Sequence, residues 1–390
     1  MKILHVYHIY PAIFGGVSRV VYDISRAQLK KGYKVSVLTT DFYYNHIDTT
    51  YIKNHNGIEV IRLPTIFKKI GKISNNPFPH PLSSSFIKTK IKFYDIIHLH
   101  GYRTLLNVTV AFYAKKSHIP IILQAHGSLP RVNNKKRLKW LYDVFFGYRL
   151  LGDVSKVIAL TETEAKQYRA MGVPEKKIAI VPNGIDLNEY VNLPPKGSFK
   201  KKFGIPAGKK IILYLGRIHR TKGIDLLVEA YAYLTKYMRC KDTLLVIAGP
   251  DDGYLLELRR LVSTLGISDK VLFTGFLSHE EKLMAFTDAE VFVTPVFYGF
   301  PTTFLESCAT GTPIITTTKG EKLEWINGKV GYVVSPTPSD LAQAIYRIIS
   351  DVKLHRVFSM NCKNIVKTRF SINHIVNEIE KIYEKSLEER

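Results

Sequence analysis

Short apolar segments alternate with longer amphipathic segments along the chain. In the first half, β-branched and aliphatic residues form strand-length segments at 3–7, 35–39, 58–63, 96–100, 119–124, 157–160 and 178–181. Apolar residues recur with helical periodicity between them, at 17–31, 104–116 and 162–171. Strands that alternate with helices in this way are typical of an α/β fold with a doubly wound parallel sheet.

The alternation begins again after an irregular stretch. Residues 187–210 contain clustered Pro, Gly and Lys without periodicity, which is typical of a domain linker. Further strands are predicted at 211–215, 244–248, 271–274, 291–294, 313–316 and 331–334, and further helices at 224–235, 254–265, 280–287, 303–309 and 341–349. We therefore expect two Rossmann-like domains, at 1–190 and 191–371, and a helix at 372–390 that crosses back to the first domain. Ligands of such sheets bind at the carboxyl ends of the strands, so we expect the site in a cleft between the two domains.

The composition is that of an ordinary globular protein. Of 390 residues, 46% are hydrophobic and 23% are charged, which excludes wholesale disorder, a collagen-like repeat and a disulfide scaffold. Cys240, Cys308 and Cys362 are spaced too widely for a zinc ribbon or a redox pair, so we expect a reducing, cytoplasmic location. No apolar run is long enough to predict a membrane-spanning helix.

A large excess of positive charge narrows the class of partner. The chain has 56 Lys and Arg against 33 Asp and Glu, a net charge of +23, and residues 1–190 carry +16 of it. Such a charge attracts nucleic acid, an anionic membrane or a phosphorylated substrate. Nucleic acid is the weakest of these interpretations because no known RNA- or DNA-binding motif is present.

Three loops between a strand and a helix carry candidate chemistry. Gly15-Gly16 follows the first strand, where adjacent glycines let a ligand approach backbone N–H groups at a helix N-terminus. A plain structural turn explains these two glycines equally well. In the loop at 215–223, Arg217 supplies a forked guanidinium and Lys222 a point charge, a pair suited to binding a diphosphate. The alternative is a solvated basic turn, and the position between a strand and a helix favours the binding role.

The third loop, 295–301, leads into a helix whose first N–H groups can bind an anion. Glu306 lies one turn inside that helix, where its carboxylate can accept two hydrogen bonds from a vicinal diol. Apolar residues flank Glu306 on both sides, so we expect it to be buried and to need a partner.

The order and spacing of these segments resemble the retaining glycosyltransferase family 4, which has the two-domain GT-B architecture. The resemblance covers essentially the whole chain. Its most specific parts are Gly216-Arg217 with Lys222-Gly223, and Gly299-Phe300-Pro301 with Leu305-Glu306 and Gly311-Thr312-Pro313. The segments 181–186 and 249–253 resemble the family's entry to the interdomain linker and its loop near the nucleotide base.

The resemblance implies a role for each matching residue. Arg217 and Lys222 would neutralise the departing nucleoside diphosphate. Glu306 would hold the ribose hydroxyls, and His126, at a strand end, would lie near the donor sugar. The implied donor-binding residues are Gly15, Gly16, Gly216, Gly249, Tyr298, Gly299, Phe300, Pro301, Thr302 and Thr303. His98 and His100 also lie near a strand end, but for these two we expect a structural role.

One position departs from the family pattern. The family commonly has two glutamates eight positions apart, one in the third loop and one in the helix that follows, and Tyr298 replaces the first of them. That glutamate ordinarily contacts the sugar, so the donor sugar stays open and a catalytically silent sugar-nucleotide-binding subunit is an alternative. Asp251-Asp252 stands in a Gly/Pro loop and is interpreted as a turn rather than a metal pair. We expect no metal and no tightly bound cofactor.

The positive charge has candidate locations at 68–72, at Lys88, Lys90 and Lys92, and at 131–142. In the last segment, cations stand next to aromatic residues that continue to Phe146. This pattern is typical of a membrane-surface segment, and equally of a solvated basic face over a buried aromatic stripe. On the first interpretation, the protein contacts the inner face of the cell membrane.

The sequence as a whole predicts a retaining glycosyltransferase. It would transfer a hexosyl or N-acetylhexosaminyl group from a nucleoside-diphosphate sugar to a hydroxyl of a sugar, a polysaccharide or a lipid-linked acceptor, and UDP and GDP sugars rank first as donors. A sugar-nucleotide epimerase or a phosphorylase of the same architecture is a further alternative.

Overall fold

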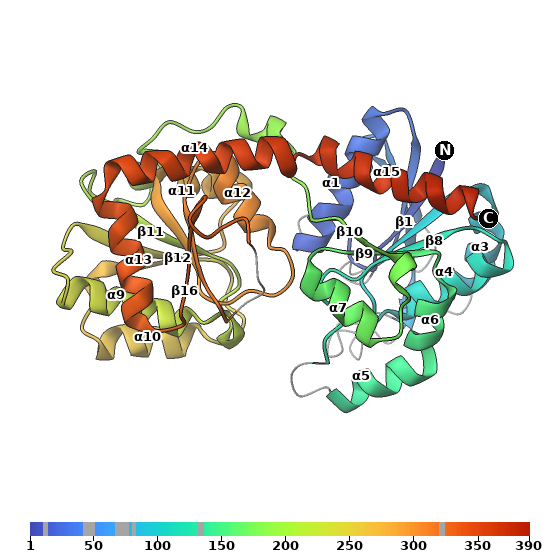
Figure 1. Ribbon diagram of the computed structural model, residues 1–390, viewed down its shortest axis with the longest axis horizontal. Coiled ribbons are helices and arrows are strands. Elements are labelled where there is room, and N and C mark those ends of the chain that lie inside the picture. Colours follow the sequence, from blue (N-terminus) through green and yellow to red (C-terminus); the bar gives the residue numbers. More distant parts are fainter. Residues whose placement is uncertain (11–14, 42–50, 67–77, 80–82, 132–135, 320–323) are drawn as a thin grey trace. The chain divides into compact units, whose positions relative to one another are not determined.

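The computed structural model describes residues 1–10, 15–41, 51–66, 78–79, 83–131, 136–319 and 324–390, which form two units (Figure 1). The first unit contains Met1–Gly184 together with Ile372–Arg390, and the second contains Ile185–Ser371. Where the sequence predicted a boundary after residue 190, the structure therefore places residues 185–190 in the second unit. The C-terminal segment belongs to the first unit.

The first unit is built on an eight-stranded sheet with the strand order β10-β9-β8-β7-β1-β2-β4-β3. All neighbouring strands are parallel except β3, which runs antiparallel to β4. The bounds are β1 (Lys2–Val6), β2 (Lys34–Thr40), β3 (Tyr51–His55), β4 (Ile58–Leu63), β7 (Ile96–His100), β8 (Ile121–Gln124), β9 (Lys156–Ala159) and β10 (Ile178–Ile180). A separate two-stranded ribbon consists of β5 (Thr65–Ile66) and β6 (Phe78–Pro79).

Strand β3 is absent from the sequence prediction. It joins β4 through Asn56 and Gly57, whose φ angles of 54° and 89° are those of a tight hairpin turn. An Asn-Gly pair between two short segments is the signal that identifies such a hairpin, and it stands in the sequence.

Helices cover both faces of this sheet (Figure 1). Their bounds are α1 (Gly16–Lys30), α3 (Ser83–Lys90), α4 (Leu105–Lys116), α5 (Lys136–Tyr142), the π-helical η3 (Asp143–Gly147), α6 (Tyr148–Asp153), α7 (Glu162–Ala170) and α15 (Ile372–Glu388), with short 3-10 turns η2 (Ile91–Phe93) and η4 (Glu175–Lys177). Buried residues of α4, α6 and α7 form one apolar cluster with the sheet, and residues of α1 and α15 form another.

Alternate residues of each strand point to the two faces, because successive side chains of a strand do so. On the face covered by α1 and α15, isoleucines such as Ile3, Ile96 and Ile122 fill the half nearer the amino ends of the strands. The same face changes to polar residues towards the carboxyl ends. These polar residues, all buried, are His5, His98, His100 and Gln124.

The second unit contains a six-stranded parallel sheet with the order β13-β12-β11-β14-β15-β16. Its strands are β11 (Lys210–Leu215), β12 (Thr243–Ala248), β13 (Val271–Gly275), β14 (Ala289–Thr294), β15 (Ile314–Thr317) and β16 (Gly331–Val334). Every predicted strand of both units is present, with its ends shifted by at most two residues.

The helices of the second unit also lie on both faces of its sheet. They are α8 (Ser198–Lys202), α9 (Ile224–Lys236), α10 (Leu255–Thr264), α11 (His279–Asp288), α12 (Thr302–Thr310), α13 (Pro338–Ser350) and α14 (Val352–Arg369), with 3-10 turns η5 (Leu187–Tyr190), η6 (Arg220–Lys222) and η7 (Ser268–Lys270). Helices α9, α10 and α13 share an apolar cluster with β11, β12 and β14. On the other face, Phe292 of β14 packs against Phe286 of α11 and Phe304 of α12.

The stretch predicted as an irregular linker is part of the second unit. The fully buried carboxylate of Asp288 accepts hydrogen bonds from the N–H groups of Gly197 (2.5 Å) and Lys200 (3.0 Å). A carboxylate stabilises the start of a helix in this way, here the start of α8. This long-range contact orders a segment whose own sequence lacks periodicity.

Within the first unit, Gly184 lies where the chain leaves the sheet and meets α15. A Cβ atom at Gly184 would lie 3.0 Å from Cγ1 of Ile375 and 3.1 Å from Cα of Ile372. Glycine therefore allows helix α15 to pack directly on this segment.

Candidate functional site

In the second unit, the loops after β11 and β12 touch through their backbones. Gly216 donates its N–H to the carbonyl of Ala248 (3.0 Å). Gly249 has a φ angle of +140°, and a Cβ atom on it would lie only 1.9 Å from the carbonyl oxygen of Gly216. The close approach requires glycine at position 249, so this predicted donor-binding residue also holds two carboxyl-end loops together.

Arg217 and Lys222 lie on the loop after β11 and differ in their partners. The Arg217 guanidinium is exposed and pairs with the Asp252 carboxylate (2.5 Å). The Lys222 ammonium forms no hydrogen bond or ion pair with any other residue in the part of the chain that the structure describes. Burial, and secondarily the charge of Arg217, lowers the pKa of Lys222. A half-buried cation beside a second cation is a position that favours a bound anion.

Asp251 and Asp252 have different partners. Asp251 accepts hydrogen bonds from the N–H groups of Gly253, Tyr254 and Leu255 at 2.9–3.1 Å. These bonds lower the pKa of Asp251 and stabilise the start of α10. Asp252 pairs with Arg217.

The loop after β14 lies against the Lys222 turn. The N–H of Val296 donates to the carbonyl of Lys222 (3.3 Å), and a Cβ atom on Gly223 would lie 2.8 Å from Cγ2 of Val296. Gly223 has a φ angle of +66°, which any residue with a Cβ adopts at a cost. The glycine thereby brings the second and third candidate loops into contact.

Helix α12 begins at the end of this third loop. Its N-cap residue is Pro301, no side chain caps its N-terminus, and no acidic residue occupies its first turn. The N–H groups at the start of a helix have no partner within the helix, so those of Thr302 and Thr303 are available to an anion. Gly299 has a φ angle of +69°, which shapes the turn that leads into the helix.

Two aromatic residues of the third loop behave differently. Phe300 is buried and packs against Trp325 and Phe370, with ring centroids 6.0 and 5.4 Å away. It anchors the loop in the core of the unit. Tyr298, which stands where the family commonly has a glutamate, is 57% exposed.

Glu306 is buried, as predicted, and has a partner that the sequence reasoning missed. Its Oε1 accepts a hydrogen bond from the Lys282 ammonium of α11 (2.8 Å). Its Oε2 is buried and has no partner among the described residues. Lys282 follows the capping box of Ser278 and Glu281, a pattern that predicts where α11 begins but not that Lys282 meets Glu306.

In the first unit, His126 lies just after β8 in a left-handed conformation. Its φ angle is 53° and that of Gly127 is 76°. The buried Glu164 carboxylate holds this turn, because Oε1 accepts the N–H of Gly127 (2.6 Å) and Oε2 accepts that of Leu160 (2.7 Å). Glu164 is a second site-supporting residue that sequence reasoning did not find.

His126, which is partly buried, is joined to two fully buried histidines, His100 and His5. Its Nε2 lies 2.9 Å from Nδ1 of His100, and Nε2 of His100 lies 2.9 Å from Nδ1 of His5. Burial lowers the pKa of His126 to about 3 and that of His5 to about 4. All these rings are therefore neutral near pH 7. His98 and His100 are fully buried.

The glycine pair of the first unit lies open to solvent. Gly15 has a φ angle of +145° and caps α1, and a Cβ atom on Gly15 or Gly16 would meet no atom of the described residues within 4 Å. Residues 11–14, which precede the pair in the predicted loop, lie outside the described residues.

His8, near the carboxyl end of β1, is a buried titratable residue that sequence reasoning did not single out. Both of its ring nitrogens are buried without a hydrogen-bond partner in the described structure. Burial lowers the pKa of His8 to about 4.

The basic aromatic segment forms a continuous helix over residues 136–153, made of α5, η3 and α6. Its exposed large apolar side chains are Leu138, Trp140, Leu141, Val144, Phe145, Phe146 and Tyr148. The predicted aromatic stripe is thus exposed rather than buried. Lys136, Arg137 and Arg149 are exposed beside it. We call these ten residues the aromatic-basic face.

Arg131 is not a freely solvated cation of this face. Its guanidinium pairs with the buried Asp143 carboxylate (2.7 Å) and donates to the Tyr148 hydroxyl (2.7 Å). Arg103 pairs with the same carboxylate (2.8 Å). Lys88, Lys90 and Lys92 are exposed, while residues 68–72 and Lys135 lie outside the described residues. Across the described chain, no helix has the length and apolar character needed to cross a bilayer.

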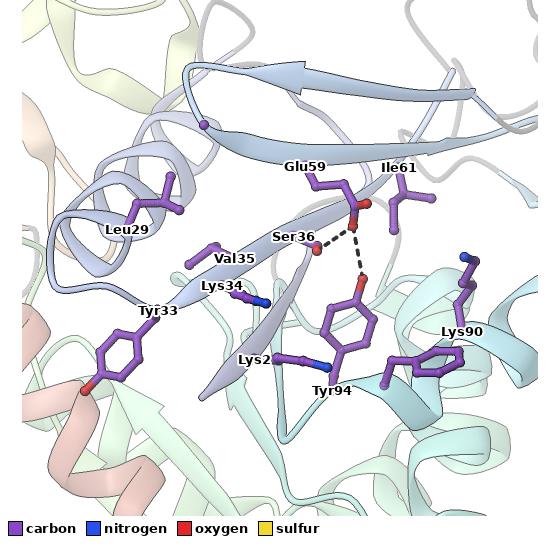
Figure 2. Close-up of a pocket in the computed structure, with 12 residues that line it drawn as sticks. Lys2, Leu29, Tyr33, Lys34, Val35, Ser36, Glu59, Ile61, Lys90 and Tyr94 are labelled. Atoms are coloured by element: carbon purple, nitrogen blue, oxygen red, sulfur yellow. Dashed lines mark hydrogen bonds between the residues drawn. The ribbon is translucent and has the colours of Figure 1, made fainter.

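A cavity of about 420 Å³ lies elsewhere in the first unit, at the amino ends of its strands. Figure 2 shows Lys2, Lys34 and Ser36 at its wall and the Glu59 carboxylate, which accepts from the Ser36 hydroxyl (2.7 Å) and the Tyr94 hydroxyl (3.5 Å). The candidate residues of this unit, in contrast, follow the carboxyl ends of β1 and β8. The cavity is therefore separate from the predicted site.

Each half of the chain matches a known protein family. Residues 14–189 match the family described as "Glycosyltransferase Family 4", and residues 195–365 match "Glycosyl transferases group 1". The motifs on which the sequence resemblance was based lie within these two matches. The first strand, the end of α14 and α15 lie outside them.

Similar proteins include enzymes with named reactions. The chain is 30% identical to an N-acetyl-alpha-D-glucosaminyl L-malate synthase of Bacillus anthracis, with 74% of each chain covered. It is 24% identical to the UDP-Gal:alpha-D-GlcNAc-diphosphoundecaprenol alpha-1,3-galactosyltransferase of Escherichia coli, with 84% of each chain covered.

Among solved structures, the chain resembles HepE of Anabaena, determined in complex with UDP and glucose. The TM-score is 0.76 at 18% identity, and the match covers 99% of this chain and 100% of the other. The likeness shows the fold, and the predicted GT-B architecture of two Rossmann-like domains is confirmed.

The buried His8 generates a pH prediction. The folded pKa of about 4 lies below the unfolded value of about 6.5, so the unfolded state binds the proton more tightly. Stability is therefore complete above pH 6.5 and is lost as the pH falls towards 4. At pH 5 this one group lowers the free energy of unfolding by about 2 kcal/mol relative to pH 7. Urea unfolding of the first unit, followed by Trp140 fluorescence in a Trp325→Phe background, measures the loss.

The His8→Phe variant should lose about 2 kcal/mol less than the parent between pH 7 and pH 5. His118→Asn gives a matched control, because it removes an exposed histidine instead of a buried one. Equal losses in the parent and in His8→Phe would contradict the burial of a neutral His8.

Proposed function

Because the chain belongs to the group 1 and family 4 glycosyltransferases, we propose that it transfers a sugar from a nucleoside-diphosphate sugar to an acceptor hydroxyl with retention of the anomeric configuration. One observation carries the proposal. Lys222 is a half-buried cation without a counter-charge among the described residues, and its turn contacts the loop that leads into the open N-terminus of α12.

A diphosphate fits this arrangement in charge and in hydrogen bonding. One phosphate would be bound by Lys222 and Arg217, and the other by the N–H groups at the start of α12. As the glycosidic bond breaks, negative charge grows on the leaving diphosphate. Preorganised cations and N–H groups stabilise such charge and lower the barrier to reaction.

Glu306 supports a nucleoside with both ribose hydroxyls. Lys282 occupies Oε1, whereas Oε2 is buried without a donor among the described residues. A buried carboxylate oxygen without a partner is costly, and a ribose hydroxyl would supply the missing hydrogen bond. This arrangement favours UDP and GDP sugars as donors over deoxyribonucleotides.

Retention of configuration is proposed from the family to which the chain belongs, and the side chains available bear on how retention would be achieved. Tyr298 replaces the first glutamate of the family pattern, and Lys282 pairs with the second carboxylate, Glu306. Tyr298 has no carboxylate, and the Glu306 carboxylate is paired with Lys282 and assigned here to the ribose, so we assign neither residue as a nucleophile. We therefore assign a front-face mechanism, in which the acceptor attacks on the side of the leaving group and a leaving phosphate oxygen assists removal of the hydroxyl proton.

The acceptor side of the proposal involves the aromatic-basic face. Seven exposed apolar side chains next to Lys136, Arg137 and Arg149 suit the surface of an anionic membrane, where apolar groups enter the interface and cations bind headgroups. The similar E. coli protein is named for a diphosphoundecaprenol acceptor. A lipid-linked acceptor at a membrane surface would account for this face of the first unit.

The binding of a ribose hydroxyl by Glu306 is tested by a thermodynamic cycle in which the Glu306 side chain and the 2′-hydroxyl of the ligand are removed separately and together. Calorimetry would measure UDP and 2′-deoxy-UDP, and GDP with its deoxy form, against the parent and Glu306→Gln. With the base that the parent prefers, removal of the 2′-hydroxyl should weaken the parent's binding free energy by about 1.5–3 kcal/mol. The same removal should weaken binding to Glu306→Gln much less. An equal loss in both proteins would contradict the ribose role of Glu306.

Transfer itself is tested by the release of free diphosphate and the anomeric configuration of the product. Diphosphate formation that depends on an acceptor, with a retained configuration by NMR, distinguishes a transferase from an epimerase or a phosphorylase. Nucleotide binding without any turnover would instead support the silent-subunit alternative that Tyr298 suggests.

Membrane binding is tested by sedimentation with vesicles of phosphatidylglycerol and phosphatidylcholine. Binding should exceed that to phosphatidylcholine alone and should fall with salt, because the attraction is screened within about 8 Å at 0.15 M. Lys136→Gln with Arg137→Gln should weaken binding roughly 30-fold, at about 1 kcal/mol per cation. Phe145→Ser should weaken it further.

Two variants in the second unit serve as matched controls for the membrane test. Lys353→Gln with Arg356→Gln removes an exposed basic pair, and Phe276→Ser removes an aromatic ring that is 72% exposed, against 68% for Phe145. Equal effects in both units, or equal binding to neutral and anionic vesicles, would rule out the aromatic-basic face as the membrane contact.

A further inference from the structure

A chain of buried polar side chains runs through the first unit to His126. Gln28 of α1 contacts Nε2 of His5 through its Oε1 (2.7 Å), and the chain continues from Nδ1 of His5 to His100 and on to His126 (2.9 Å at each step). Gln28, His5 and His100 are fully buried. The three histidines come from segments far apart in sequence, the strand β1, the strand β7 and the turn after β8.

Helix α15 fixes the other end of the chain. The Gln28 amide nitrogen contacts the hydroxyl of Tyr383 (3.5 Å), and that hydroxyl lies 2.6 Å from Nδ1 of His98. Hydrogen bonds donated by a hydroxyl are typically this short, whereas those donated by N–H groups are longer. The Tyr383 hydroxyl therefore donates to His98, and its oxygen accepts from the Gln28 amide nitrogen.

This assignment sets the direction of every hydrogen bond in the chain. With its nitrogen turned to Tyr383, Gln28 presents its carbonyl oxygen to His5, so Nε2 of His5 carries the proton. A neutral imidazole has one N–H and one acceptor nitrogen. Nδ1 of His5 thus accepts from Nε2 of His100, and Nδ1 of His100 accepts from Nε2 of His126. His126 is left with a lone pair on Nδ1.

Two further observations agree with neutral, fixed rings. Burial lowers the pKa of all three rings well below neutrality, so none gains a second proton near pH 7. Nδ1 of His126 is buried and has no partner in the described structure. An acceptor nitrogen in that position lacks a donor, which a ligand hydroxyl would supply.

The same histidines need to be considered as a metal site. Nitrogens of His5, His98 and His100 lie within 4.8 Å of one another. However, both nitrogens of His5 and both of His100 already take part in the hydrogen-bonded chain. Nε2 of His98 alone remains without a partner in the described structure, so the geometry favours hydrogen bonding over metal binding.

We propose that Gln28 and Tyr383 are positioning residues which, through His5 and His100, fix the tautomer of His126 so that its Nδ1 accepts a hydrogen bond from a hydroxyl of the sugar substrate. The identity of that hydroxyl as a substrate group rests on the proposed function. The tautomer itself does not. On this proposal, α15 acts on the site through hydrogen bonds as well as by packing on the sheet.

The tautomer is measured by NMR of the ¹⁵N-histidine-labelled protein without ligand and with EDTA. We expect His126, assigned by comparison with His126→Asn, to carry its proton on Nε2. Gln28→Met and Tyr383→Phe should each give a mixture of tautomers at His126. Gln124→Met is the matched control, because Gln124 is buried, pairs with His100 in strand register and lies outside the chain. It should leave the His126 tautomer unchanged.

Turnover gives a second measurement that separates this proposal from the proposed function. With a donor that the parent uses, Gln28→Met should lower kcat about 10-fold or more, as loss of a partner that orients a functional histidine commonly does. Absence of glycosyl transfer in the parent would refute the function and leave the tautomer result standing.

Three results would overturn the positioning role. They are a proton on Nδ1 of His126 in the parent, an unchanged His126 tautomer in both Gln28→Met and Tyr383→Phe, and ring-nitrogen shifts that EDTA alters as a bound metal would. Tyr383→Phe removes one hydroxyl, so it gives an answer even where Gln28→Met does not fold.

Discussion

The candidate site of the second unit depends on the close approach of backbones at the carboxyl ends of its strands. Gly249 touches the carbonyl of Gly216, and Gly223 touches Val296, at distances that a Cβ atom would prevent. These two contacts bring together three loops that are far apart in sequence. Because parallel strands end at one edge of the sheet, the loops meet there, and Lys222 and the start of α12 share one region. The glycines thus determine where positive charge is placed.

The two units differ in how they accommodate buried polar side chains. In the second unit, Lys222 is a half-buried cation that has no counter-charge among the residues that the structure describes. The first unit contains most of the excess positive charge of the chain, while its buried histidines are kept neutral by desolvation and connected by hydrogen bonds. Buried polar groups that are fully connected rigidify their surroundings, whereas a buried polar group without a partner is costly.

Sequence patterns predicted the strands well because buried parallel strands are short, apolar and rich in β-branched residues. Arg217 and Lys222 could be singled out because they stand at a strand–helix junction, and Glu306 because it lies one turn inside the helix that follows another such junction. The partners of these residues could not be predicted. Lys282 meets Glu306 across 24 positions and His100 meets His5 across 95, and such pairs depend on helix packing and strand register. Arg131 was grouped with surface cations because its partner, Asp143, is buried by the fold.

The central claim is that Lys222 stabilises charge that develops on the leaving diphosphate. It is tested most directly by measuring kcat, the KM of the donor and the affinity for the free diphosphate in Lys222→Met, with Lys236→Met, an exposed lysine of the same unit, as control. We predict that kcat falls about 10²–10³-fold, that the KM changes little, and that free diphosphate binds more weakly. A raised KM with kcat preserved would contradict the claim, because it would show that Lys222 only binds the ground state.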